Sequence, residues 1–238
     1  KKDYSQNNTI TITQTPLATL DKKEETPVPL PKHTKEDNTP APSITIIDKS
    51  KEIFEIKNLV RLEDIDDTFV IDLKYATRDN FTGKVIYSEN ICVIHKDTAK
   101  KLISANEDLK KLGYRLKILD AYRPFSAQQV LYDSASDKSY VANPQRGSVH
   151  NRGSAVDVTL VDNEGNELVM PSAFDEQTQR AHIDYYGGSE EETANRELLA
   201  KVMTENGFRR INIEWWHFED LEGLNYPILD IPLEKFKK

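Results

Sequence analysis

The most constraining feature of the sequence is the stretch 148–160, where a histidine, a glycine and an aspartate lead into an alternating β-pattern. Apolar residues at alternate positions from Val156 onward would share one strand face, which turns Asp157 to the other face. A buried carboxylate there is costly unless something cationic meets it. His150 lies seven positions earlier, and an unbroken strand would point it away from Asp157. The chain must therefore bend between them, and Gly153 is the expected bend.

A second block, residues 213–218, contains both tryptophans of the chain between Glu214 and His217. If His217 joins His150 and Asp157, two histidines and one carboxylate suit zinc with a fourth position open for water. Glu214 precedes His217 by three positions, so one turn or bulge would bring both side chains to that water, where Glu214 could act as a base. The alternative for Glu214 is a solvent-facing strand residue.

Arg123 lies directly before Pro124, in a fixed bend that could hold its guanidinium rigidly. Aimed at a scissile carbonyl, such a donor stabilises the developing oxyanion by about 2.7–4 kcal/mol. The alternative is a structural ion pair with a neighbouring carboxylate.

The other histidines and the single cysteine have simpler interpretations. His33, His95 and His182 are interpreted as solvated or capping residues, and Cys92 lies in an apolar run that predicts a buried strand. One cysteine also excludes an internal disulfide framework and a cysteine-rich metal site.

Charge and hydropathy exclude two classes of partner. The 238-residue chain has a formal net charge of −8 without clustered basic residues, so nucleic acid is not an expected partner. No apolar run approaches the roughly 18 residues that a transmembrane helix needs.

Residues 1–52 differ in composition from the rest. Six of the eleven prolines and nine threonines precede Ile46, and glycine is absent there. Such a segment predicts a Pro/Thr-rich flexible tail, because it buries too little apolar surface to offset its chain entropy. A spacer of this kind fits anchoring through the tail and an extracytoplasmic location, in the periplasm or cell envelope. Residues 53–238 are expected to form one domain.

The pattern in residues 53–238 mixes helices and short strands without a βαβ rhythm. It predicts an α+β fold with flanking helices around a small, largely antiparallel sheet. Strands are expected at 69–73, 91–94, 116–119 and 156–160, and a last strand from Ile211 into the tryptophan block. Helices are expected from 97 or 98 to 112 before Gly113, at 126–132 behind a capping box that opens at Ser126, and at 191–206 before Gly207.

Four separated motifs, in order, resemble the zinc D-alanyl-D-alanine dipeptidases of the vancomycin-resistance type, peptidase family M15. The resemblance runs from about residue 68 to the C-terminus. The motifs are residues 74–83, Asp120-x-Tyr122-Arg123-Pro124, Ser148-x-His150-x2-Gly153-x-Ala155-x-Asp157 and Glu214-x-Trp216-His217.

The resemblance implies the zinc fold shared by D-Ala-D-Ala peptidases and hedgehog domains, with one zinc ion on His150, Asp157 and His217. It also implies Glu214 as catalytic base and Arg123 as transition-state stabiliser. In the family, acidic and tyrosine side chains bind the ammonium of the dipeptide. The matching positions here are Asp175, Tyr75 and Asp120. Ser148 is expected to contact the substrate carboxylate, although Val149 replaces a second serine of the family pattern.

The first functional hypothesis is hydrolysis of D-Ala-D-Ala to two D-alanines in cell-wall peptide turnover or recycling. The second is a zinc D,D- or L,D-carboxypeptidase acting on peptidoglycan stem peptides. The third is a non-catalytic zinc or wall-binding module, against which the presence of both Glu214 and Arg123 argues.

Overall fold

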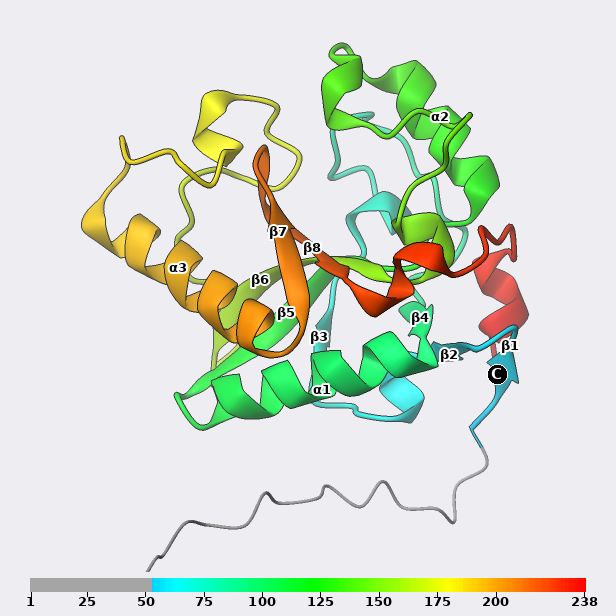
Figure 1. The fold of residues 1–238 in the computed structure, drawn as a ribbon, viewed down its shortest axis with the longest axis horizontal. Coiled ribbons are helices and arrows are strands. Elements are labelled where there is room, and N and C mark those ends of the chain that lie inside the picture. Colours follow the sequence, from blue (N-terminus) through cyan, green and yellow to red (C-terminus); the bar gives the residue numbers. More distant parts are fainter. Residues whose placement is uncertain (1–52) are drawn as a thin grey trace, which may run out of the picture. The chain divides into compact units, whose positions relative to one another are not determined.

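Two β-sheets and three α-helices make up residues 53–238, the part of the chain that the computed structural model describes. The prediction for residues 1–52 lies outside this range. A five-stranded sheet has the order β3-β5-β6-β8-β7, and a three-stranded sheet has the order β1-β2-β4 (Figure 1). The strands are β1 (Glu55–Ile56), β2 (Leu59–Arg61), β3 (Val70–Ile71), β4 (Val93–His95), β5 (Tyr114–Asp120), β6 (Ala155–Asp162), β7 (Phe208–Ile211) and β8 (Glu214–Asp220). The helices are α1 (Lys96–Lys110), α2 (Phe125–Ser134) and α3 (Glu190–Glu205).

The expected α+β architecture is confirmed. All described strand pairs are antiparallel except β3 with β5, which run parallel. The strand expected at 69–73 is shorter than predicted, because only Val70 and Ile71 pair with β5. None of the described helices is both long and apolar enough to cross a membrane.

Helices α1 and α3 begin and end close to their predicted positions. The ring of His95 caps α1 by accepting a hydrogen bond from the Asp97 amide, which confirms its capping interpretation. Gly113 and Gly207 follow α1 and α3 with φ of 85° and 89°, the left-handed conformation of a helix end. A capping box between Ser189 and Glu192 opens α3.

The capping box predicted at Ser126 is wrong. Helix α2 already begins at Phe125 after Pro124, and its first turn has no side-chain cap from the N-cap residue. The backbone amide of Ser126 instead donates to a carboxylate oxygen of Asp230, at 2.9 Å. The cap comes from a residue 104 positions away, which the local sequence pattern could not indicate.

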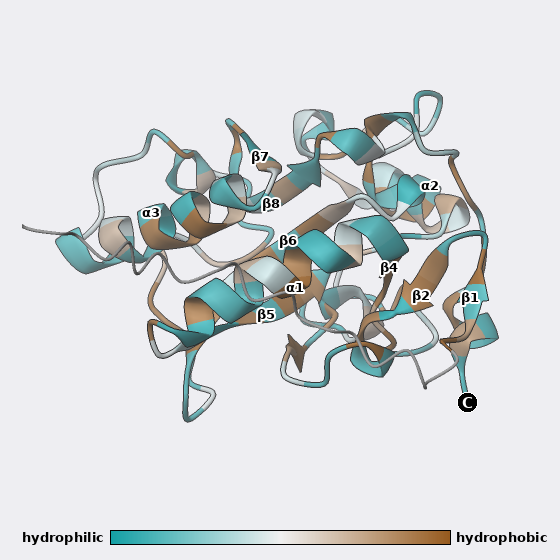
Figure 2. Ribbon diagram, turned by 60° about the horizontal axis from the view of Figure 1, so that its bottom comes forward, coloured by the Kyte–Doolittle hydropathy of each residue, from teal (hydrophilic) through white to brown (hydrophobic). Residues whose placement is uncertain are grey.

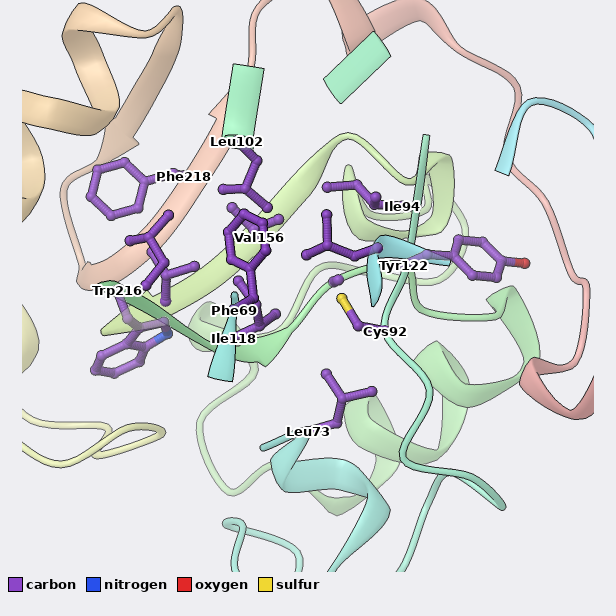
Figure 3. Packing of buried hydrophobic residues seen from close by; sticks show 14 of the residues in the cluster. Phe69, Leu73, Cys92, Ile94, Leu102, Ile118, Tyr122, Val156, Trp216 and Phe218 are labelled. Atoms are coloured by element: carbon purple, nitrogen blue, oxygen red, sulfur yellow. The ribbon is translucent and has the colours of Figure 1, made fainter. Parts of the chain in front are cut away.

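The two faces of the central strands carry different side chains, apolar on one face and polar on the other. Val156 on β6 pairs with Phe218 on β8, and both are fully buried close to Leu102 of α1 (Figure 3). Figure 2 shows apolar residues along β5 and hydrophilic turns on the outer side of α1. Since side chains alternate along a strand, the next pair, Asp157 and His217, is directed to the opposite face.

Cys92 is fully buried in the same hydrophobic cluster, as predicted for a small core residue. Burial raises the pKa of its thiol well above the ordinary value. A neutral, inaccessible thiol is a poor nucleophile.

Candidate metal and active site

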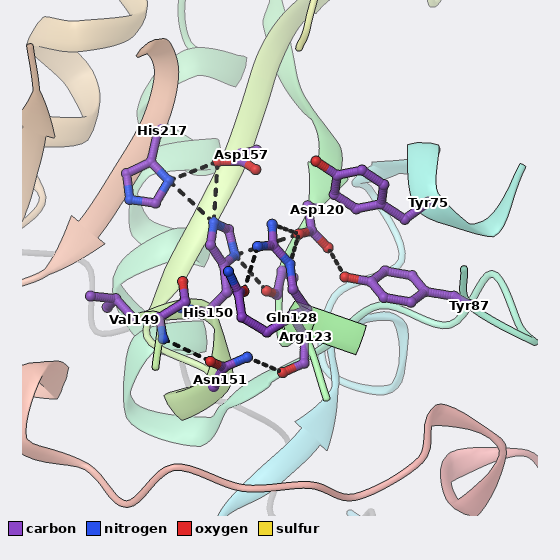
Figure 4. A network of polar contacts seen from close by, with 12 residues as sticks. Tyr75, Tyr87, Asp120, Arg123, Gln128, Val149, His150, Asn151, Asp157 and His217 are labelled. Carbon is purple, nitrogen blue, oxygen red and sulfur yellow. Dashed lines mark hydrogen bonds and ion pairs between the residues drawn. The ribbon is translucent and has the colours of Figure 1, made fainter. Parts of the chain in front are cut away.

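Three side chains meet on the face of the central sheet opposite Val156 and Phe218. His150 lies in a short 3₁₀ helix, Asp157 on β6 and His217 on β8 (Figure 4). His150 Nε2 is 3.1 Å from His217 Nδ1 and 3.4 Å from Asp157 Oδ1, and His217 Nδ1 is 2.9 Å from Asp157 Oδ1. All three side chains are buried. We call this set the metal triad, because each member offers one ligand atom within 4.8 Å of the others.

The bend between His150 and Asp157 occurs at Gly153, as predicted. Its φ is 67°, in the left-handed region. A Cβ atom there would lie 2.6 Å from a methyl carbon of Leu59 and 2.9 Å from the backbone nitrogen of His95. Only glycine therefore fits both the backbone conformation and the space, and the turn brings His150 back over the strand that carries Asp157.

The metal triad fits a tetrahedral divalent ion. Metal–ligand bonds of about 2.1 Å in a tetrahedron place ligand atoms about 3.4 Å apart, close to the three distances observed. The second nitrogen of each ring has its own acceptor. His150 Nδ1 lies 2.7 Å from the Ala121 carbonyl oxygen, and His217 Nε2 lies 3.3 Å from Glu219 Oε1. These contacts direct the remaining nitrogens, Nε2 of His150 and Nδ1 of His217, toward the centre that they share with Asp157.

Hydrogen bonding also sets the charges of the triad. Burial alone would raise the pKa of Asp157, but its interactions with His150 and His217 hold that pKa well below its ordinary value. Burial raises the pKa of Glu214 to about 7, against the opposing effect of His217. A carboxylate with such a pKa can accept and release a proton near neutral pH.

A bulge in β8 brings Glu214 to the triad. Arg210 and Ile211 are consecutive on β7, yet they pair with Phe218 and Glu214 on β8. Residues 215–217 of β8 therefore have no paired residue on β7. A bulge of this kind bends the strand that contains it. Glu214 Oε2 ends 3.9 Å from His217 Nδ1, so the base candidate and the ligand candidate share one centre.

Arg123 forms the structural ion pair that was one of the two alternatives predicted for it. Its guanidinium donates to Asp120 Oδ2 through Nε and Nη2, at 3.2 and 2.7 Å, and through Nη1 to Gln128 Oε1 at 2.8 Å. It also lines the cavity that contains the metal triad. These three bonds occupy three of the five N–H donors of the guanidinium, which leaves two for a substrate.

The structure places Asp120 behind Arg123 and not among the residues that line the cavity. Its carboxylate is fully buried, and it accepts a 2.7 Å hydrogen bond from the Tyr87 hydroxyl beside its ion pair with Arg123 (Figure 4). The predicted direct contact with a substrate ammonium therefore has no support in this geometry. Asp120 instead holds the guanidinium in place.

Asp175 and Tyr75 lie together at another part of the cavity wall. The Tyr75 hydroxyl donates to Asp175 Oδ1 at 3.0 Å, while Asp175 Oδ2 is inaccessible and has no hydrogen-bond partner. Burial and the neighbouring charge of Asp157 raise the pKa of Asp175 to about 8. Its φ of 60° is uncommon for a residue other than glycine. A strained, incompletely paired carboxylate is typical of a ligand-binding position.

Two aromatic residues of β8 hold the loop that carries Asp175. The indole nitrogen of Trp215 donates to Ser172 Oγ at 2.9 Å. The ring of Phe174 packs edge-on against Trp216 at 5.4 Å and against Tyr75 at 6.0 Å. The tryptophan block therefore supports the loop in addition to carrying His217.

The cavity itself has a volume of about 270 Å³. This lies just below the range of roughly 300–1,000 Å³ that is typical of sites for drug-sized ligands, and so it suits a small substrate. The polar side chains on its wall include the metal triad, Glu214, Arg123, Asp175, Tyr75 and Ser148.

Sequence reasoning missed several residues that support the site. Asn151 is fully buried; its side-chain nitrogen donates to the Arg123 carbonyl at 3.0 Å, and its oxygen accepts from the Ser148 amide at 2.7 Å. Gln128 and Tyr87 complete the surroundings of Arg123 and Asp120. Glu219 was detectable in principle, because it lies two positions after His217 and so on the same strand face.

Among residues 53–238, the two other histidines do not join the triad. His182 Nε2 lies 3.1 Å from the Tyr140 hydroxyl, and His95 caps α1 as described. His33 lies outside the described residues.

Comparison with known proteins agrees with the geometry. Residues 55–234 match the Peptidase_M15 family model, described as D-ala-D-ala dipeptidase. The D-alanyl-D-alanine dipeptidase of Escherichia coli K12 is 43% identical over 159 residues, which cover 67% of this chain and 82% of the relative. Those of Enterococcus faecalis V583 and Enterococcus faecium are 36% and 37% identical, over 62% of this chain and 84% and 83% of the relatives. The chain therefore belongs to the D-alanyl-D-alanine dipeptidase family of metallopeptidases, peptidase family M15.

Proposed function

We propose that this protein hydrolyses the dipeptide D-Ala-D-Ala into two D-alanines with one zinc ion in the metal triad. The observation that carries the proposal is the convergence of the triad, Glu214, Arg123 and Asp175 on a single cavity of about 270 Å³. The names of the curated relatives support the choice of substrate.

Two histidines and a carboxylate form the donor set that suits zinc in catalytic sites. When bound, the ion would supply Lewis acidity to the scissile carbonyl and a more acidic water. Glu214 would take the proton of the attacking water and deliver it to the leaving amine, since its Oε2 lies beside the triad, 3.9 Å from His217 Nδ1.

Arg123 would stabilise the oxyanion that develops at the scissile carbonyl. Its ion pair with Asp120 and its bond to Gln128 fix the guanidinium before substrate arrives. Preorganised donors of this kind avoid the reorganisation that mobile donors require.

Asp175 and Tyr75 would receive the substrate ammonium. The carboxylate of Asp175, which lines the cavity, would pair with the ammonium, and the cation would stabilise its ionised form. A longer or N-blocked peptide places an uncharged amide at this position and leaves the buried acid without a charge partner. The site would therefore favour a free dipeptide.

The test compares D-Ala-D-Ala, its N-acetylated form and L-Ala-L-Ala, with metal content measured on the same purified protein. We expect cleavage of free D-Ala-D-Ala alone and about one zinc per chain. Cleavage of the N-acetylated dipeptide at a comparable rate would replace the proposal with a carboxypeptidase activity. Failure to cleave any of the three by a zinc-loaded protein would favour a non-catalytic module.

For the biological setting, we propose cell-wall peptide turnover or recycling outside the cytoplasm, with residues 1–52 as a tether. The composition of that segment supports a spacer between the domain and an anchor. Fractionation of cells that express the full-length protein tests the location, and recovery in the cytosolic fraction would contradict it.

A further inference from the structure

One carboxylate at the metal triad has no place in the proposed chemistry. Glu219 lies on β8 two positions after His217, and only 7% of its surface is exposed. Its Oε1 is 3.3 Å from His217 Nε2. Its Oε2 accepts a hydrogen bond from Arg209 Nε at 2.7 Å and forms an ion pair with Arg209 Nη2 at 2.6 Å.

The orientation of His217 makes this contact consequential. His217 faces the other triad members through Nδ1. Its Nε2 is then the nitrogen that bears hydrogen, and it lies in a buried region. An imidazole ring can rotate and exchange its tautomer, so a ring without a fixed acceptor at Nε2 has several arrangements, of which one binds the ion.

We propose that Glu219, held by Arg209, is a positioning residue that fixes the His217 ring with Nδ1 toward the metal and so sets the metal affinity. This inference rests on the proposed zinc site. His150 differs, because its second nitrogen is held by the backbone carbonyl of Ala121, which no side-chain substitution removes. Glu219 is therefore the triad support that a side-chain mutation can test.

Arg209 reaches Glu219 from the neighbouring strand. The two residues are directly paired across β7 and β8, and the Arg209 side chain is 49% exposed. Its Nε and Nη2 both lie against the single oxygen Oε2, which leaves Oε1 free to face His217.

The chain contains a matched control pair. Arg210, the next residue on β7, pairs with Glu197 of α3 at 3.1 Å through Nη1. Among the described contacts, neither residue touches the metal triad. Both ion pairs join an arginine of β7 to a glutamate, and only Glu219 contacts His217 among the described residues. Glu197 is the more exposed glutamate and also pairs with Arg196.

The experiment measures the zinc dissociation constant of the metal-depleted full-length protein by competition with a chromophoric chelator. The variants are Glu219→Gln, Glu219→Ala and Arg209→Ala, with controls Glu197→Gln and Arg210→Ala. We expect Glu219→Ala to weaken zinc binding by roughly 10- to 100-fold, the usual effect of losing an outer partner of a metal-bound histidine. Glu219→Gln keeps an acceptor and should weaken it by less. Arg209→Ala should have the smallest effect of the three, and the controls should stay within about twofold.

A second readout follows the Co²⁺-substituted protein. Its visible absorption reports ligand geometry, and we expect Glu219→Ala to alter the spectrum while Glu197→Gln leaves it unchanged. If Glu219→Ala unfolds, the near-isosteric Glu219→Gln gives the answer in both measurements.

Parental zinc affinity and an unchanged cobalt spectrum in Glu219→Ala would overturn the inference. Equal weakening in the Glu219 variants and the controls would overturn it too, because that result indicates general destabilisation. The positioning role alone is refuted if the parent binds zinc and cleaves the dipeptide while Glu219→Ala binds zinc with the parental affinity. A parent that binds no zinc refutes the proposed function together with the role of Glu219.

Discussion

The metal triad and the loop that carries Asp175 line one cavity, yet they are built in opposite ways. Asp157 and His217 are paired across two neighbouring strands, and each histidine ring has an acceptor for its second nitrogen. Asp175 lies between β6 and α3 in a loop, with a left-handed backbone and a buried oxygen without a partner.

The difference separates two tasks. The triad is fully oriented before any substrate binds, as catalytic electrostatics require. Among the described contacts the Asp175 carboxylate is bound only by the Tyr75 hydroxyl, so in the proposed function a cationic group would complete its surroundings and an uncharged one would not. We therefore expect substitutions near the triad to lower the chemical rate, and substitutions in the loop to change which substrate is accepted.

The largest effect is expected for Glu214→Gln, which removes the base but none of the triad. We expect kcat to fall by about 10²- to 10⁴-fold, the usual contribution of a positioned acid–base group. Zinc content should stay at the parental value, and kcat is measured by D-alanine release. Glu197→Gln is the control for loss of a carboxylate elsewhere. A Glu214→Gln variant with the parental kcat would remove Glu214 from the mechanism.

Substitution of Arg123 should affect both rate and stability. Arg123→Met is expected to lower kcat by roughly 10²- to 10³-fold. It also leaves the buried Asp120 without its cation, which should destabilise the fold by about 3–5 kcal/mol in denaturant titration. Gln128→Ala removes a single bond to the guanidinium and should lower kcat by less than about tenfold. Equal rates in Arg123→Met and the parent would reduce Arg123 to a structural ion pair.

Asp175→Asn tests the loop side of the comparison. Loss of a charged hydrogen-bond partner should lower kcat/KM for free D-Ala-D-Ala by roughly 10- to 100-fold. The value for N-acetyl-D-Ala-D-Ala should not fall, so the ratio between the two substrates shrinks. Stability should be unchanged or higher, because a buried carboxylate with an unpaired oxygen is removed and asparagine tolerates a positive φ. An unchanged substrate ratio would separate Asp175 from ammonium recognition.

The smallest effect is expected for Ser172→Ala, which frees the loop from Trp215. The buried indole N–H loses its acceptor, which should destabilise the protein by about 1–3 kcal/mol. We expect KM for the dipeptide to rise a few-fold, at roughly constant kcat, because the hydroxyl does not contact the triad. Ser88→Ala, at an exposed hydrogen bond to Glu234, is the matched control. A fall in kcat without a change in KM would show that the loop also supports the chemistry.

The sequence by itself determined the fold class, the ends of α1 and α3 and the bend between His150 and Asp157. Alternating apolar residues predicted β6, and the glycines after α1 and α3 marked the helix ends because their conformations are local. The odd spacing of His150 and Asp157 required a bend, and Gly153 has the positive φ that a bend there needs. The helix ends and the bend depend on residues that are neighbours in the chain.

Only the tertiary structure decided which partner each buried polar group meets. Asp230 replaces the capping box expected at Ser126, and Asp120 pairs with Arg123 in place of a substrate. Glu219 reaches His217 while Arg209 holds it from the adjacent strand. Spacing along one segment predicts which face a side chain occupies, but the choice of partner depends on strand register and on segments that are distant in sequence. Burial makes that choice strict, since an unpaired polar group inside the protein costs more free energy than any local preference provides.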